Sequence, residues 1–189
     1  MSFSLNRNRR IKLLQSQRFL NRVRDEDPYM IPIIPSLISI NKLGFITIDS
    51  QSGRKESGIS YLDGLPYLLL YRSYVFGVMT SQLAKLFISR FNYPHLHSII
   101  VPIVNNAEPS VANDIPLTIS RKKDGDTIIT HMSKVLPKRI ASNYLAQAGF
   151  DTRYDSKTDL VFIFCWDSKW LRPALHKNGL FTSIIKTLS

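Results

Sequence analysis

The polar side chains best placed for chemistry come at the end of a short alternating segment, residues 44–53. Apolar residues alternate up to Ile48, and Asp49, Ser50 and Gln51 follow directly. This pattern predicts a half-buried strand that carries three polar side chains to one end of a sheet. Ligands of α/β sheets usually bind at strand ends, so this segment is the first candidate site.

A second candidate group is the guanidinium of Arg72, at the start of an apolar strand predicted over residues 72–79. If the two strands are neighbours, Asp49, Ser50, Gln51 and Arg72 form one ligand-binding constellation. Arg72 would then bind a phosphate or carboxylate through two hydrogen bonds, while the Gln51 amide contacts a polar edge. The alternative is that Ser50 and Gln51 bind loop backbone groups and Arg72 pairs with Asp49.

The segment from Pro35 to Gly53 resembles an uncharacterised family of small α/β domains. Its motif is Asn-x-x-Gly-Phe-x-Thr-x-x-Ser-Gln-Pro-Gly followed by a Gln-Arg-Ala strand, and residues 30–92 follow this pattern. Ser52 replaces the proline, and Tyr71-Arg72-Ser73 replaces Gln-Arg-Ala. The resemblance implies a fold and the pairing of two strands, and no reaction. The composition, rich in Ile, Asn and Lys, also resembles proteins of large DNA viruses.

The sequence lacks most of the residue patterns that are typical of enzyme active sites. Glutamate occurs only at positions 26, 56 and 108, each in a segment predicted to be a loop, and no phosphate-binding glycine motif is present. His95 and His97 have no carboxylate at ligand spacing, and Cys165 lies in the most apolar strand. We therefore predict no catalytic residues, no metal site and no cofactor, and favour a non-enzymatic protein.

Positive charge is concentrated at the N-terminus. Residues 1–24 contain no acid and account for seven of the eleven net positive charges. The seven basic residues are Arg7, Arg9, Arg10, Lys12, Arg18, Arg22 and Arg24. A further basic cluster is Arg121, Lys122 and Lys123, at the predicted tip of a hairpin.

A single helix is predicted over residues 5–24, which lack Gly and Pro. In one interpretation it is a solvated helix that packs Leu13, Leu20 and Val23 on the rest of the chain. In the second, its cations contact nucleic-acid phosphates and release counterions. In the third, the helix binds an acidic protein partner.

The remaining elements predict an α/β (α+β) fold. We expect a single sandwich with a mixed sheet of about five or six strands and flanking helices, preceded by the basic helix. Residues 1–27 would form the N-terminal arm, and residues 28–189 one domain. A loop is predicted over 52–66, a hairpin over 115–132, a helix over 138–148 that ends at Gly149, and a central strand over 160–166.

The sequence contains one cysteine and no apolar run approaching the ~20 residues of a membrane span. These features, with a polar N-terminus, predict an intracellular, non-secreted protein of the cytoplasm, the nucleus or a virus particle. The predicted function is a structural or binding component of a large assembly, of virion or nucleoprotein type, whose basic helix contacts nucleic acid or an acidic partner. The alternative is a domain or enzyme acting on an anionic ligand at Ser50, Gln51 and Arg72.

Overall fold

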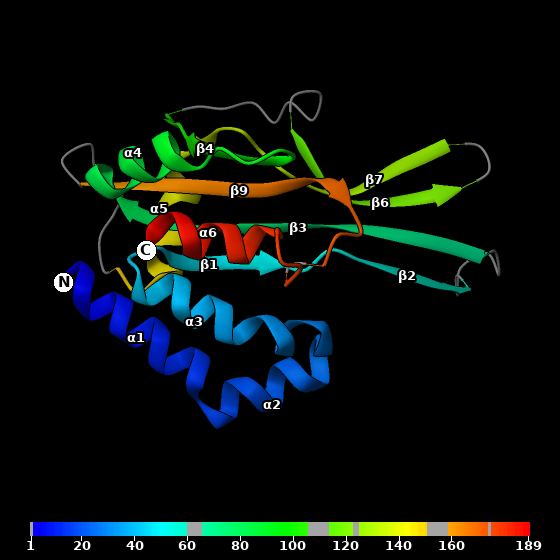
Figure 1. Cartoon of the computed structure of the whole chain (residues 1–189), viewed down its shortest axis with the longest axis horizontal. Coiled ribbons are helices and arrows are strands. Elements are labelled where there is room, and N and C mark those ends of the chain that lie inside the picture. The colour runs from blue at the N-terminus through cyan, green and yellow to red at the C-terminus, as the bar shows by residue number, and fades with distance from the viewer. Residues whose placement is uncertain (1, 60–65, 106–113, 123–124, 151–158, 174) are drawn as a thin grey trace.

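A computed structural model describes residues 2–59, 66–105, 114–122, 125–150, 159–173 and 175–189 (Figure 1). Its elements form the α/β fold expected from the sequence, with a large curled sheet and helices on both of its faces.

The sheet is built around one long strand, β3 (Pro66–Thr80). Its neighbours change along its length. Over the first half, up to Tyr71, they are β2 (Arg54–Ile59) and β6 (Ile115–Lys122). Over the second half they are β1 (Ile46–Gln51) and β9 (Leu160–Trp170). The outer strands are β4 (Leu96–Val101), beside β9, and β7 (Gly125–Met132), beside β6.

One face of the second half is covered by most of the helices. They bury Val75 and Met79 of β3 together with Cys165 of β9. These helices are α1 (Phe3–Gln15), α2 (Gln17–Glu26), η1 (Pro28–Ile33), α3 (Ile34–Lys42), α4 (Ser81–Arg90) and α6 (Leu180–Leu188). The opposite face carries Phe76 and Val78 and packs on α5 (Lys138–Gln147). The first half of β3, with β2, and the hairpin of β6 and β7 extend beyond the helices (Figure 1).

The predicted N-terminal arm is folded against the rest of the chain. Leu14 and Val23 are 1% and 8% exposed and belong to the same core as Phe181 of α6. Leu20 and Val23 pack on the core as predicted, whereas Leu13 is 44% exposed and Leu14 takes its place in α1. The prediction of one helix was wrong, because Ser16 ends α1 and its hydroxyl accepts a hydrogen bond from the Phe19 N–H, which caps α2.

Three further predictions need correction. The predicted loop over 52–66 contains β2, because Arg54 to Ile59 pair with the first half of β3. The second strand begins at Pro66 rather than near Arg72. A mixed sheet was predicted, but the described strands of the large sheet all pair antiparallel. The parallel pairing belongs to a separate small sheet of β5 (Ile103–Val104) and β8 (Leu136–Pro137).

Other predictions are confirmed. β6 and β7 form the expected hairpin, and β9 lies between β3 and β4 inside the sheet. Gly149 follows α5 with a φ of +86°, a left-handed conformation that glycine adopts without steric cost.

The motif residues at the start of β1 serve the fold. The amide of Asn41, which is fully buried, donates to Leu37 O at 2.7 Å and to Thr47 Oγ1 at 2.8 Å. The Thr47 N–H donates back to Asn41 Oδ1 at 3.2 Å. These bonds join the end of α3 to β1, and Gly44 makes the turn between them with a φ of +98°.

Candidate functional site

A β-bulge in β1 sets the direction of Asp49. Thr47 pairs with Gly77 of β3, and Asp49 pairs with the next residue, Phe76, so Ile48 is the extra residue between them. Side chains alternate between faces along a regular strand, and one extra residue reverses the alternation beyond it. Asp49 therefore lies on the face of Phe76 instead of the face of Thr47.

The Asp49 carboxylate accepts two hydrogen bonds. The Ser50 N–H donates to Oδ1 at 2.7 Å, and the Tyr74 hydroxyl donates to Oδ2 at 2.9 Å. Loss of hydration raises the pKa of Asp49, although these hydrogen bonds and the charge of Arg10 act in the opposite direction. The residue keeps solvent-accessible surface because it borders an open cavity, whereas the protein around that cavity removes part of its hydration.

The cavity lies where β3 exchanges its neighbours, and its volume is about 360 Å³. Strands β1, β3, β6 and β7 and helix α5 contribute to its walls. The volume falls in the range of small-molecule sites, which are mostly apolar with a few polar groups. The apolar wall consists of Leu69, Phe76, Leu117, Ile129 and Met132.

Three tyrosines, Tyr71, Tyr74 and Tyr144, also line the cavity. Burial and then the negative charge of Asp49 raise the pKa of Tyr74 and that of Tyr144. Burial also raises the pKa of Tyr71, and its hydroxyl donates to Glu56 Oε2 at 3.0 Å. All three phenols therefore stay protonated at neutral pH, and the site combines the Asp49 carboxylate with three tyrosine rings.

His131 of β7 is a further polar group of the cavity wall. Its Nε2 lies 3.1 Å from Oδ2 of Asp114, whose side chain is 8% exposed. The His131 side chain is 38% exposed, so its ring meets both solvent and the cavity. The contact with Asp114 fixes the orientation of the imidazole.

The structure brings together only part of the predicted constellation. Asp49 and Gln51 both line the cavity. Ser50 pairs with Val75, which belongs to the opposite core, so Ser50 faces away from the cavity. Arg72 is not a cavity residue, although Gln51 Nε2 donates to its backbone oxygen at 3.4 Å. Tyr74, instead of Arg72, contacts the Asp49 carboxylate.

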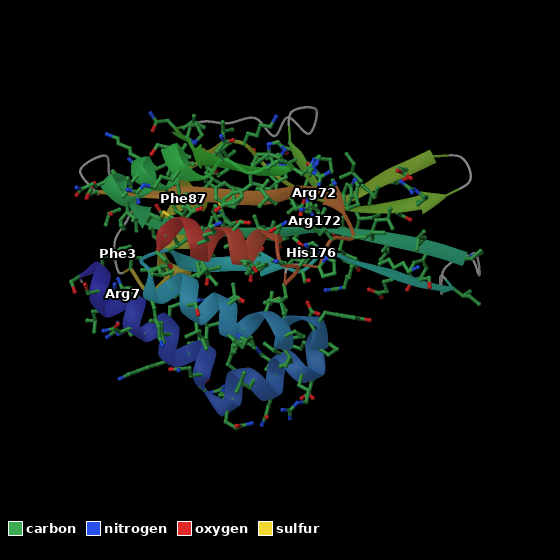
Figure 2. The ribbon with its side chains drawn as sticks, in the orientation of Figure 1. Phe3, Arg7, Arg72, Phe87, Arg172 and His176 are labelled. Carbon is green, nitrogen blue, oxygen red and sulfur yellow. The ribbon has the colours of Figure 1, made fainter. Side chains whose placement is uncertain are left out.

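The basic residues of α1 and α2 fall into two groups. Arg7 and Arg10 are half-buried, and Arg10 Nη2 donates to Ile48 O at 3.1 Å, which ties α1 to β1. Figure 2 shows Arg7 next to Phe3 along α1. The other five are exposed, namely Arg9, Lys12, Arg18, Arg22 and Arg24.

The basic hairpin tip is partly neutralised. Arg121 contacts Asp126 through two hydrogen bonds, of 3.0 Å from Nε and 3.1 Å from Nη2. Lys122 is the last residue of β6, and its side chain falls outside the described part of the chain, as does all of Lys123. Arg121 is therefore already bound to an acid of its own hairpin.

Most residues of the cavity wall were not predicted from the sequence. Tyr71 and Tyr74 lie in an aromatic-rich strand, and this enrichment was the available signal. Tyr144 and His131 come from distant segments, and only the packing of α5 on the sheet and the pairing of β7 with β6 bring them to the cavity.

Other candidate residues have structural surroundings. Cys165 is fully buried, and burial raises the pKa of its thiol. The His97 ring stacks on Trp166 with 5.1 Å between ring centroids. Within the described ranges, no three side chains of His, Cys, Asp or Glu lie close enough together to hold a metal ion. None of the described helices has the length and apolar character needed to cross a bilayer.

Comparison with models of known protein families gives no match to this chain, and comparison with curated protein sequences gives none either.

Proposed function

We propose that the protein binds a small organic cation, such as an ammonium compound, in the cavity between β1, β3, β6, β7 and α5. The supporting observation is the position of Asp49, whose partly dehydrated carboxylate lies beside the rings of Tyr74 and Tyr144. Aromatic faces attract ammonium groups through their quadrupole, and a nearby carboxylate adds a direct charge interaction.

The charge of the cavity argues against the anionic ligand expected at Ser50, Gln51 and Arg72. The guanidinium of Arg72 is absent from the cavity wall, and Asp49 would repel an anion placed there. A cation bound beside Asp49 would instead compensate the carboxylate for part of the hydration energy that it has lost. The apolar wall leaves room for the carbon skeleton of the ligand.

Titration calorimetry with choline and its uncharged isostere 3,3-dimethylbutan-1-ol tests this proposal on the full chain. We expect choline to bind at least about tenfold more tightly, a difference of about 1.4 kcal/mol. Asp49→Asn should abolish this preference because it removes the charge and keeps the shape. Asp25→Asn, at an exposed position of α2, should retain it. Equal affinity of the wild-type protein for both compounds, or binding of neither, would refute the proposal.

A second candidate function rests on the exposed cations of α1 and α2. We infer that this surface contacts the phosphate backbone of a nucleic acid, as a component of a large nucleoprotein assembly or virus particle would. Arg18, Arg22 and Arg24 lie on one short helix, and Arg9 and Lys12 continue the charge on its neighbour. The corresponding compartment is the inside of a cell or of a particle assembled there.

The dependence of affinity on salt tests this second function. For double-stranded DNA, the logarithm of the binding constant should fall linearly with the logarithm of the salt concentration. Arg18→Gln combined with Arg24→Gln should reduce the slope by about 0.9 for each phosphate that the variant no longer neutralises. A slope that stays the same in the double variant would locate DNA binding elsewhere or exclude it.

A further inference from the structure

The side chain of Arg72 is not part of the cavity wall and lies against the ring of Trp170. Its guanidinium carbon lies 4.2 Å from the centroid of the Trp170 ring, and the two residues are cross-strand partners in β3 and β9. Arg72 is half-buried, and its Nε is shielded from solvent without a hydrogen-bond partner among the described residues. The ring therefore orients a guanidinium whose donors are not all used.

The acid that acts on Arg72 is already bound by another arginine. Burial lowers the pKa of Arg72, and the charge of Asp167 partly opposes this effect. The fully buried carboxylate of Asp167 lies 2.7 Å from Nε of Arg172 and accepts a hydrogen bond of 2.9 Å from its Nη2. It also accepts a hydrogen bond of 2.9 Å from the Lys169 N–H. Among the described residues, the one negative charge of Asp167 therefore acts on two guanidinium groups, and this group of side chains carries excess positive charge.

The backbone oxygen of Arg172 is held by Ser73 of β3 and lies close to Gly53, between β1 and β2. The hydroxyl of Ser73 donates to Arg172 O at 2.8 Å and accepts a hydrogen bond of 2.7 Å from the Gly53 N–H. Gly53 lies so close to Arg172 O that a Cβ atom there would collide with it. The position of Arg172 is therefore set before any ligand arrives, which lowers the entropic cost of binding.

The turn that precedes α6 adds a third basic side chain. Nη1 of Arg172 donates to Asn178 O at 3.2 Å, and the Asn178 N–H donates to Nδ1 of His176 at 3.3 Å. His176 is exposed. In Figure 2 the side chains of Arg72, Arg172 and His176 are labelled along the end of β9 and this turn.

We propose that Arg72, with Arg172 beside it, forms a binding site for an oxyanion, either a phosphate or a carboxylate group. A planar guanidinium that is oriented on an aromatic ring binds such groups through two parallel hydrogen bonds. The site is separate from the cation-binding cavity and has the opposite charge preference, so either proposal can fail without the other.

Calorimetric titration of the full chain with inorganic phosphate, AMP and N-acetylglycine, at constant ionic strength, tests this site. We expect at least one of them to bind, and Arg72→Gln to weaken that binding at least about tenfold. Arg90→Gln is the matched control, because it removes an exposed arginine at the end of α4, away from both proposed phosphate-binding surfaces, and should leave the affinity unchanged. Binding of phosphate and AMP alone would identify a phosphate group as the ligand, and binding of N-acetylglycine alone a carboxylate.

The Nε–H nuclear magnetic resonance signal of Arg72 in the wild-type protein gives a readout that does not depend on the folding of a variant. We expect phosphate, AMP or N-acetylglycine to shift this signal, while chloride at equal ionic strength leaves it in place. An unmoved signal with all three compounds, or equal affinity in wild type and Arg72→Gln, would overturn the proposal.

Discussion

The two halves of β3 differ in their surroundings more than in their sequence. Residues 72–80 lie between β1 and β9, and helices cover both of their faces. Residues 66–71 are equally apolar, yet only Leu70 is buried among them, because this half extends beyond the helices. The candidate cavity lies at the boundary, where Tyr74 from the second half and Asp49 from the neighbouring β1 meet Leu69 and Tyr71 from the first half.

The comparison shows that burial is decided by the layers above a strand and not by the strand alone. At Arg72 and Ser73 the pairing of β3 with β9 is irregular, and β6 replaces β9 as neighbour. This change of neighbours interrupts the regular pairing of β3 next to the cavity. Four experiments, two of which compare a pair of substitutions, test how far the two halves differ.

The largest effect is expected for Gly77→Ala in the second half. A Cβ atom at this position would collide with the backbone oxygen of Ile46, and a paired strand cannot move away without losing its register. We expect a loss of about 3 kcal/mol or more in the free energy of unfolding, measured by urea denaturation. Gly58→Ala is the matched control in β2, because its Cβ would meet only the movable hydroxyl end of Tyr67. Equal losses of unfolding free energy in Gly77→Ala and Gly58→Ala would contradict the expected difference between the two positions.

The next effect is expected for Met79→Ala, which truncates a fully buried side chain of the second half. Lost burial and the resulting cavity should cost about 2–5 kcal/mol. Leu68→Ala, at a half-buried position of the first half, should cost less than about 1.5 kcal/mol because solvent or neighbouring side chains fill the space. The same denaturation experiment measures both. A loss of more than about 1.5 kcal/mol for Leu68→Ala would mean that a partner or a second copy of the chain covers the first half of β3.

A smaller effect is expected for Asp49→Asn at the boundary. Since the pKa of the folded carboxyl is raised, its ionisation opposes folding, and this unfavourable contribution grows as the pH rises from the unfolded pKa to the folded one. The variant lacks this contribution and should be at least as stable as the wild type at pH 7. Thermal unfolding between pH 3 and pH 7 measures the difference, which should favour the variant more as the pH rises. A variant that is less stable at pH 7 would make Asp49 a structural residue.

The smallest effect is expected for Ile128→Thr in β7. Ile128 is 44% exposed on a strand that extends beyond the helices, and threonine keeps the β-branched shape that strands favour. The free energy of unfolding should change by no more than about 0.5 kcal/mol. A clear stabilisation, together with loss of self-association in sedimentation, would instead indicate that the hairpin forms an interface between copies of the chain.

Local signals in the sequence were sufficient for many elements. The alternation of residues 44–53 predicted β1, continuous apolarity predicted that β9 is an interior strand, and Gly149 marked the end of α5. Such signals work because strand pleating, burial on two faces and a left-handed turn each depend on neighbouring residues. The break between α1 and α2 at Ser16 was missed, because serine is tolerated inside a helix and its capping role depends on how α2 packs.

The sequence by itself determined that Asp49 and Gln51 would lie at the end of a strand, and it left open whether that strand pairs with the strand of Arg72. Only the tertiary structure decided where these side chains point. One extra residue in β1 aims Asp49 at the cavity, and Arg72 lies against Trp170. The physical reason is that the register of a strand with its neighbours decides which side chains lie on each face of the sheet. A single bulge exchanges the two faces beyond it, and the local composition of the strand does not encode that register.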